Sequence, residues 1–160
     1  MPQLSLYFNK KFHQYYMTKV QMETNLTISH RPKIFQLKSI GNSIEGYITI
    51  AEAANYIPFE IKRVYWTYYT PQNVIRGFHA HKVLHQAIFA VCGTIKFIVE
   101  ELDGTREEYI LNEPHIGLYL PPYTWREIQF SHNAVLLCLA SEHFDESDYI
   151  RNYEDFKNEG

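Results

Sequence analysis

The sequence predicts an all-β fold, a small sandwich or barrel that ends in a short C-terminal helix. Its 160 residues suit one domain with a proper core. Aromatic residues make up 16% of the chain, with 13 Tyr and 10 Phe, and such rings pack well on the pleated surface of a sheet. Short apolar or alternating runs also recur between turn residues, which is the pattern of many short strands.

The expected strands follow one another from the end of the first thirty residues to the acidic tail. In order they are "KIFQLKSI", "GYITIAEA", "IKRVYWTYYT", "HQAIFAVCG", "TIKFIVEE", "REEYILNEP", "HIGLYLPP", "TWREIQFS" and "NAVLLCLASE". The pair Asp103-Gly104 marks a hairpin between two of them. In the tail, apolar residues from Tyr149 to Phe156 recur at helix-like intervals, so we expect the helix there, capping the barrel.

Composition and charge restrict the class of protein. Residues 1–31 are polar and weakly periodic, so we interpret them as an N-terminal extension without an assigned role, ahead of one domain over residues 32–160. A net charge of −3 offers no basic surface for nucleic acid. No apolar stretch suits a signal peptide or a membrane span, and Cys92 and Cys138 lie in apolar runs, as buried free thiols do. We therefore expect a cytoplasmic protein with no membrane and no nucleic-acid partner.

The stretch "RGFHAHKVLHQ" is the strongest candidate for a functional site. On a strand, residues i and i+2 point to one face, so His79 and His81 are neighbours there. His85 shares that face only if no bulge or turn intervenes. Two titratable side chains on one face, directly after the bend at Arg76-Gly77, favour a functional role over a surface role.

These residues resemble the two motifs of the cupin superfamily, a family of small jelly-roll-type β-barrels. "GFHAHKVLHQAIFAVCG" resembles the first motif and "GLYLPPYTWRE" the second. Where metal-binding cupins complete the ligand set with a glutamate and a last histidine, this chain has Gln86 and Arg126. Gln86 offers only a weak neutral oxygen, and Arg126 is a permanent cation that would repel a metal ion. We expect no metal and no other cofactor; stoichiometric metal required for activity would contradict this.

A closer resemblance extends from about Pro32 to Phe156. The segments "IPFEIKRVYW", "RGFHAHK", "GLYLPPYTW" and "ASEHFDESDYIRNYEDF" together resemble the WxcM-like sugar 3,4-ketoisomerases that act on dTDP-4-oxo-6-deoxyglucose. The resemblance implies an isomerase of dTDP-deoxyaminosugar biosynthesis, and a homodimer in which strands near the N-terminus can be shared between subunits. It also implies a downstream PLP-dependent aminotransferase, met through the product on the way to an N-acylated amino sugar of a surface glycan such as O-antigen.

Histidine chemistry suits this reaction. Moving the oxo group from C4 to C3 requires removing the C3 proton, passing through an enediol(ate) and delivering a proton to C4. Histidine can act as base and then acid near neutral pH. We expect His79 to be the principal base at carbon and His81 to be its partner or the oxygen-side shuttle, an order that the residues leave open. By resemblance, the Tyr65 hydroxyl donates to a sugar oxygen or to the enediolate.

Four further residues are expected to bind the substrate. Arg63 shares one strand face with Tyr65, and Arg76 is well placed to bind a pyrophosphate bidentately. Gln86 is expected to bond a sugar hydroxyl or to orient a histidine, and Arg126 to clamp sugar oxygens.

Arg126 also bears on the stereochemistry at C4. By resemblance this position varies between histidine and arginine among family members that form the galacto and the gluco product. An arginine cannot give up its proton near neutral pH, which leaves protonation to the side of His79 and His81. Because this chain has the arginine, we expect the gluco product, dTDP-3-oxo-6-deoxyglucose, over the galacto isomer.

Three other functions compete with this interpretation. A dTDP-sugar 3,5-epimerase resembles a His–Asp dyad pattern that the sequence does not show around His79. A non-catalytic sugar-binding cupin would explain a pocket but not two titratable groups on one face. A metal-dependent dioxygenase conflicts with the residues at the ligand positions.

Overall fold

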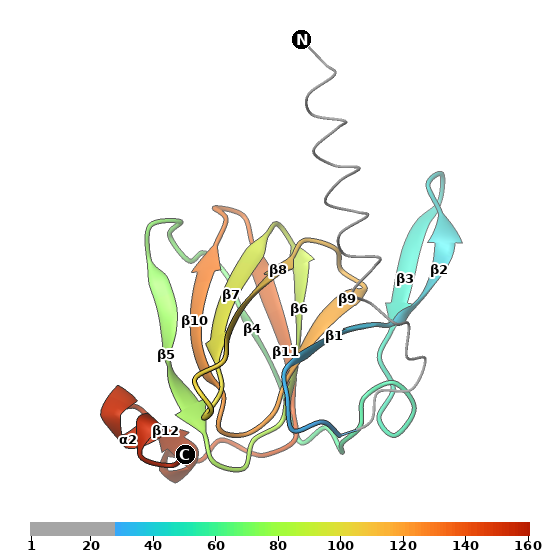
Figure 1. The fold of residues 1–160 in the computed structure, drawn as a ribbon. Helices are drawn as coiled ribbons and strands as arrows, with labels where there is room; N and C mark the ends of the chain where they lie inside the picture. The colour runs from blue at the N-terminus through green and yellow to red at the C-terminus, as the bar shows by residue number, and fades with distance from the viewer. Residues whose placement is uncertain (1–27) are drawn as a thin grey trace.

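The computed structural model describes residues 28–160, which form two facing five-stranded antiparallel sheets in a jelly-roll barrel (Figure 1). One sheet has the order β1, β9, β6, β11, β4, with bounds Lys33–Gln36, Ile116–Leu120, Gln86–Cys92, Val135–Ala140 and Arg63–Thr67. The other has the order β12, β5, β10, β7, β8, with bounds Tyr149–Ile150, Ile75–His81, Trp125–Phe130, Ile95–Glu100 and Arg106–Leu111. The prediction of an all-β cupin barrel is confirmed.

The main core lies between the two sheets. Along β7 the inward positions Ile95, Phe97 and Val99 are buried, as period-2 alternation requires. They pack with buried residues of the facing sheet, among them Leu118 of β9 and Leu136 of β11. Burying each such side chain contributes about 1.5–3 kcal/mol, so this layer supplies much of the stability of the barrel.

A second apolar cluster covers the outer face of the β1–β9–β6–β11–β4 sheet. Ile57, from the segment between β3 and β4, is fully buried against it. Its neighbours in the cluster are the buried residues Phe35, Leu37, Ala87, Phe89, Tyr119 and Leu139. The outer face of this sheet is therefore covered, and its inner face borders the interior between the two sheets.

The C-terminal segment lies beside the lower end of β5, at one end of the barrel (Figure 1). The helix α2 spans only Tyr153–Lys157, after a 3₁₀ turn η1 at Glu146–Asp148. The expected helix is therefore wrong for Tyr149 and Ile150, which form β12 because the free edge of β5 accepts their backbone. Phe156 is fully buried and packs against the Trp125 ring, 5.7 Å between centroids.

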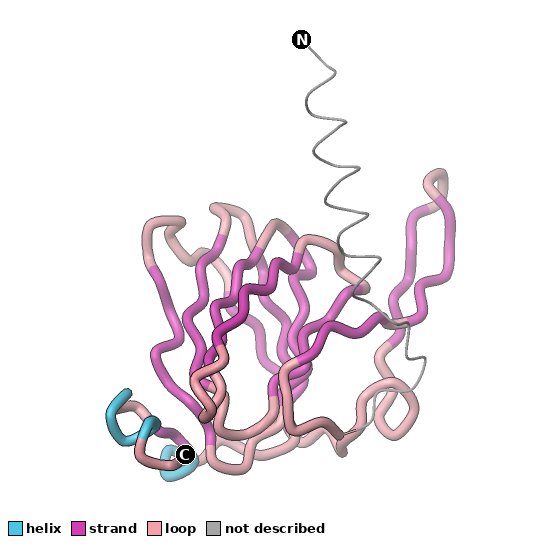
Figure 2. Tube along the Cα trace, viewed as in Figure 1, coloured by secondary structure: helices cyan, strands magenta, loops and turns pink. Residues whose placement is uncertain are grey.

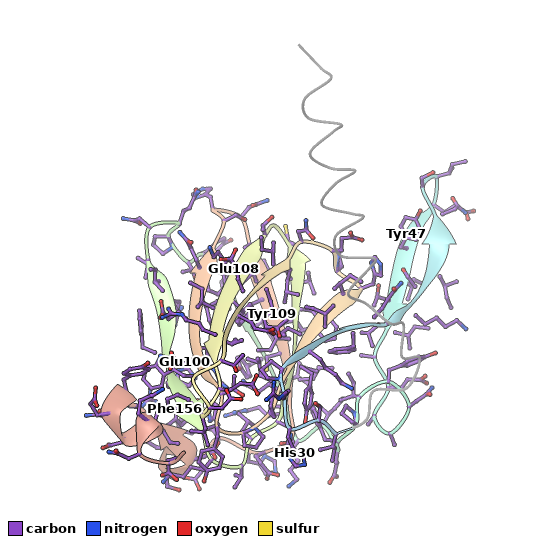
Figure 3. All side chains as sticks on the ribbon, in the orientation of Figure 1. His30, Tyr47, Glu100, Glu108, Tyr109 and Phe156 are labelled. Carbon is purple, nitrogen blue, oxygen red and sulfur yellow. The ribbon has the colours of Figure 1, made fainter. Side chains whose placement is uncertain are left out.

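A buried carboxylate holds α2 on the barrel. Glu100 accepts hydrogen bonds from the Tyr153 hydroxyl at 2.8 Å and from the Lys157 ammonium at 3.1 Å. Figure 3 shows Glu100 and Phe156 at this end of the barrel, where β7 and α2 meet. The segment that carries β12 is thus fixed on both sides.

The hairpin of β2 (Lys38–Asn42) and β3 (Gly46–Ile50) stands away from the barrel (Figure 2). It forms a two-stranded sheet of its own. Apolar side chains on it are exposed, including Tyr47, which Figure 3 labels, and Ile48 at 68%. An exposed apolar hairpin of this kind marks a surface that another chain can cover.

The structure also bears on the expectations about the cysteines, a membrane span and the N-terminal extension. Cys138 is buried as expected, but Cys92 is exposed because it ends β6 at the barrel rim; both are free thiols. Within residues 28–160, helices are too short and too polar to cross a bilayer. The N-terminal extension predicted at residues 1–31 lies almost entirely outside the described residues.

Candidate active site

A cavity of about 570 Å³ opens between the two sheets. Six of the seven predicted site residues lie on its wall, namely Arg63, Tyr65, Arg76, His79, Gln86 and Arg126. With Arg151, its lining includes four arginines and, among the described residues, no acidic side chain. The cavity is therefore suited to a ligand that carries negative charge.

A β-bulge in β5 directs His79 into the cavity. In the pairing of β5 with β10, His79 lies opposite Arg126 and Gly77 opposite Glu127, so Phe78 is the extra residue. Gly77 has φ +95° and Phe78 φ +52°. A Cβ on Gly77 would lie 2.5 Å from the carbonyl oxygen of Arg126, so only glycine lets the two strands approach here.

His79 is a neutral base in this environment. Its Nδ1 lies 2.9 Å from the Gly77 carbonyl oxygen, which can only accept, so Nδ1 carries the proton and Nε2 the lone pair. Burial, and next the charge of Arg126, lower the pKa of His79 to about 4. The imidazole is therefore uncharged at neutral pH, with a lone pair on Nε2.

Arg126 is a buried cation that lacks hydrogen-bond partners among the described residues. Its side chain is 2% exposed, and its Nε and both terminal nitrogens have no hydrogen-bond partner within residues 28–160. Burial lowers the pKa of Arg126 to about 10, which still leaves the guanidinium charged at neutral pH. Buried donors of this kind cost free energy unless something bonds to them, so the cavity is built for a ligand with several oxygen acceptors.

Tyr65 and Gln86 form a second polar group in the cavity. Gln86 Nε2 donates to the Tyr65 hydroxyl at 2.8 Å and reaches Cys138 Sγ at 3.5 Å. Burial raises the pKa of Tyr65 well above its usual value, so its hydroxyl keeps its proton. Gln86 Oε1 is buried without a partner among the described residues and can accept from a ligand hydroxyl.

His81, the seventh predicted residue, does not line the cavity. It is 1% exposed, and its ring lies edge-on to His79 with 5.0 Å between centroids. Its Nδ1 lies 2.7 Å from Asp148 Oδ2, and its ring is 4.2 Å from that of Tyr149. The two histidines therefore share a strand face but occupy different depths.

Sequence reasoning missed the contribution of the C-terminal segment to this site. Asp148 contacts His81, and Phe144, Tyr149 and Arg151 line the cavity. The helix-like spacing from Tyr149 to Phe156 predicts only a capping helix, and it gives Phe144, Asp148 and Arg151 no role. The acidic-aromatic-basic order of "ESDYIR", next to a strand with two histidines, is the signal that could have drawn attention to them.

Aromatic rings hold two of the arginines at the cavity. The Arg63 guanidinium lies 5.4 Å from the centroid of the Tyr65 ring, and that of Arg151 lies 4.2 Å from the Tyr149 ring. Arg151 also pairs with Glu146 through Nε at 2.6 Å. Arg76 is exposed and lines the cavity, as a residue that binds the outer part of a ligand would.

The donor set does not fit a metal ion. Within residues 28–160 no three His, Cys, Asp or Glu side chains converge as a ligand group. Arg126, a cation, lies opposite His79, and Gln86 on the cavity wall offers only a weak neutral amide oxygen. His85 lies elsewhere, bonded to Tyr119 at 2.7 Å.

Residues 30–160 match the family described as "FdtA: WxcM-like, C-terminal". The chain is 40% identical over 126 residues to TDP-4-oxo-6-deoxy-alpha-D-glucose-3,4-oxoisomerase of Aneurinibacillus thermoaerophilus, covering 78% of this chain and 89% of the relative.

Two solved structures are similar along most of their length. QdtA, a sugar 3,4-ketoisomerase of Thermoanaerobacterium thermosaccharolyticum in complex with TDP, has a TM-score of 0.77 and 38% identity, covering 82% of this chain and 96% of that one. WlaRB, a TDP-quinovose 3,4-ketoisomerase of Campylobacter jejuni, has a TM-score of 0.76 and 40% identity, covering 81% and 99%.

Proposed function

The chain belongs to the WxcM-like FdtA family and is a nucleotide-sugar 3,4-ketoisomerase, and we propose that it moves the oxo group of dTDP-4-oxo-6-deoxyglucose from C4 to C3. The observation that carries this proposal is the complementarity of one cavity: a neutral histidine base, a protonated tyrosine, a free amide oxygen and an unpartnered arginine. A sugar with a carbonyl next to a hydroxyl supplies the matching acceptor, donor and acidic carbon.

His79 is the base for the first step. With Nδ1–H donated to Gly77, its Nε2 lone pair is free to remove the proton from C3, which the neighbouring C4 carbonyl acidifies. The carbonyl electrons move onto O4, and an enediol(ate) forms. A proton delivered to C4 then leaves the oxo group at C3.

Arg126 and Tyr65 stabilise the charge that develops on the sugar oxygens. Arg126 lies opposite His79, and its guanidinium nitrogens have no hydrogen-bond partner among the described residues, so an enediolate oxygen can accept from them. The Tyr65 hydroxyl, which receives a bond from Gln86, has its own proton to give. The proton that must pass between O3 and O4 can travel through this hydroxyl.

The charged part of the substrate fits the arginine-rich wall. Arg76 and Arg63 are candidates for the pyrophosphate, since planar guanidinium groups bind phosphate oxygens bidentately. The relative QdtA has been observed with TDP bound, which supports a nucleotide ligand in this type of cavity.

The deciding experiment is incubation of the protein with dTDP-4-oxo-6-deoxyglucose in D₂O, followed by NMR. We expect deuterium at the carbons of the C3–C4 pair and a new 3-oxo signal. Exchange at C5 would instead indicate a 3,5-epimerase, and no exchange would indicate a sugar-binding protein, so both rival functions are tested together.

For the product we infer the gluco isomer, dTDP-3-oxo-6-deoxyglucose. H3 of the substrate and H4 of a gluco product lie on opposite faces of the ring, so C4 must receive its proton from the face opposite the one from which His79 removes H3, and Arg126 cannot serve as that acid. The similarity to WlaRB, named for TDP-quinovose, agrees with this inference, because quinovose is 6-deoxyglucose. A large trans-diaxial coupling between H4 and H5 of the product supports it, and a small coupling means the galacto isomer.

The functional unit is proposed to be a homodimer. Ile40, Tyr47 and Ile48 are exposed on the β2–β3 hairpin, which forms a two-stranded sheet of its own. Strand β4 is a sheet edge and exposes Val64 and Trp66. An apolar hairpin and an apolar sheet edge can cover each other between two copies, which removes both from water.

A PLP-dependent aminotransferase is the proposed next enzyme. The 3-oxo product carries a carbonyl, which is the group that transamination converts to an amine. A coupled assay with such an aminotransferase and an amino donor should form the 3-amino sugar, and its absence in the presence of 3-oxo product would count against this order.

A further inference from the structure

Both carboxylate oxygens of Asp148 take part in hydrogen bonds at the end of β5. Its Oδ1 accepts from the backbone N–H groups of Lys82 at 2.9 Å and Val83 at 2.8 Å. Its Oδ2 lies 2.7 Å from His81 Nδ1. The carboxylate side chain is only 9% exposed, so these bonds form away from bulk water.

The segment that carries Asp148 is itself fixed. The neighbouring Tyr149 pairs with His81 in the β12–β5 ladder, and the Lys82 N–H also donates to the Asp148 carbonyl oxygen at 2.9 Å. Asp145 caps the preceding turn by accepting from the Ser147 N–H. The position of the carboxylate relative to His81 therefore follows from the backbone and not from a mobile side chain.

These contacts determine which nitrogen of His81 carries the proton. A carboxylate can only accept, so Nδ1 must donate, and in the neutral ring Nε2 then holds the lone pair. We propose that Asp148 is a positioning residue of the reaction, which keeps His81 as the Nδ1–H tautomer with Nε2 as its proton acceptor. This inference rests on the proposed function, because it assigns His81 a part in the proton transfers of that reaction.

The surroundings favour a neutral pair over an ion pair. Although Asp148 lies close, burial and then the guanidinium of Arg126 hold the pKa of His81 below its usual range. The ring also lies against His79 and Tyr149, at 5.0 and 4.2 Å between centroids. A fixed tautomer behind the carbon base gives the site a second, differently oriented acceptor for a proton.

A spectrum of the wild-type protein tests the tautomer without reference to activity. The full chain is labelled with ¹⁵N-histidine, and the His81 signals are identified by their loss in His81→Gln. We expect one protonated and one pyridine-like nitrogen at neutral pH, the pyridine-like nitrogen being Nε2. Two protonated nitrogens, or a proton on Nε2 alone, would overturn the proposal.

The variant Asp148→Asn separates positioning from structural support. The asparagine Oδ1 can still accept from Lys82 and Val83, but its amide then presents N–H to His81 Nδ1. This N–H can donate only to a lone pair on Nδ1, so the His81 proton must move from Nδ1 to Nε2. The corresponding tautomer reversal in the Ser-His-Asp triad lowers kcat by about 10⁴-fold, and we expect a fall of about 10²-fold or more here with KM changed less than about threefold.

The matched control is Asp155→Asn, which removes the same charge from the exposed side of α2. It should leave kcat and the His81 spectrum unchanged. If Asp148→Asn reverses the tautomer while kcat is retained, His81 is not a positioned group and the inference fails. If the wild type turns over no TDP-sugar, the proposed function fails, while the spectrum still decides the tautomer.

Discussion

The amide of Gln86 on β6 reaches across β11 to the hydroxyl of Tyr65 on β4, with 2.8 Å between Nε2 and the phenolic oxygen. Because the amide is the donor, the tyrosine proton points elsewhere, either to Cys138 Sγ, with which the hydroxyl also interacts, or to a ligand in the cavity. The bond thus sets the direction in which Tyr65 can act, and it links two residues that the sequence separates by a whole strand and loop.

Replacing Tyr65 by Phe should lower kcat by about 10²- to 10³-fold, the usual effect of removing one donor to a developing oxyanion. Steady-state kinetics with dTDP-4-oxo-6-deoxyglucose measure it. The control is Tyr68→Phe, at an exposed tyrosine just past the end of β4. Equal kinetics in the two variants would remove Tyr65 from the mechanism.

His79 should give the enzyme an unusual pH profile. A base works only when unprotonated, and the pKa of His79 is about 4, so kcat/KM should stay level from pH 8 to about 5.5 and fall tenfold per unit well below pH 4. His79→Asn should abolish turnover, whereas the exposed His132→Asn should not. Circular dichroism at each pH must show folded protein, and a midpoint near 6.5 would refute the assignment.

Replacing Arg126 by Met should stabilise the ligand-free protein, because it removes a buried cation whose donors have no partner in the described part of the chain. Desolvating such a charge costs several kcal/mol, so we expect the free energy of unfolding to rise by at least about 1 kcal/mol. Binding of TDP-sugar should weaken at the same time. Urea unfolding and isothermal titration calorimetry measure the two effects, and a destabilised variant with intact binding contradicts both.

Replacing Phe156 by Ala should cost about 3–5 kcal/mol of stability, the usual loss for a fully buried aromatic side chain. The exposed Glu159→Ala, also at the C-terminal end, is the control and should stay within about 0.5 kcal/mol. Since β12 precedes α2 directly, activity should fall with temperature earlier than in the wild type. Thermal denaturation with parallel activity measurements tests both statements.

Charged residues on either proposed dimer surface should give monomers. Trp66→Lys on β4 and Ile48→Lys on the hairpin each place a charge where two apolar surfaces would meet. Val83→Lys, at a residue of similar exposure between β5 and β6, is the control. Light scattering after size-exclusion chromatography should show monomers for the first two only; dimers in all three would exclude this interface.

The strands and the histidine pair could be predicted because both depend on local patterns. The alternation along "TIKFIVEE" and the continuous apolar run of "HQAIFAVCG" are properties of neighbouring residues, and so is the shared face of His79 and His81. The contact between His81 and Asp148 spans 67 residues, and nothing in the local pattern of the tail indicates it. The same reason explains β12, where pairing with β5 overrides a helix-like spacing.

The unpartnered guanidinium of Arg126 has a consequence for how this protein can be altered. Any screen that rewards folding alone will favour apolar replacements at this position, because they relieve the cost of the buried charge. The most heat-resistant members of a random library should therefore include inactive ones. Selection for turnover has to act continuously against that drift, and thermal robustness has to come from other positions, such as the apolar contacts around Phe156.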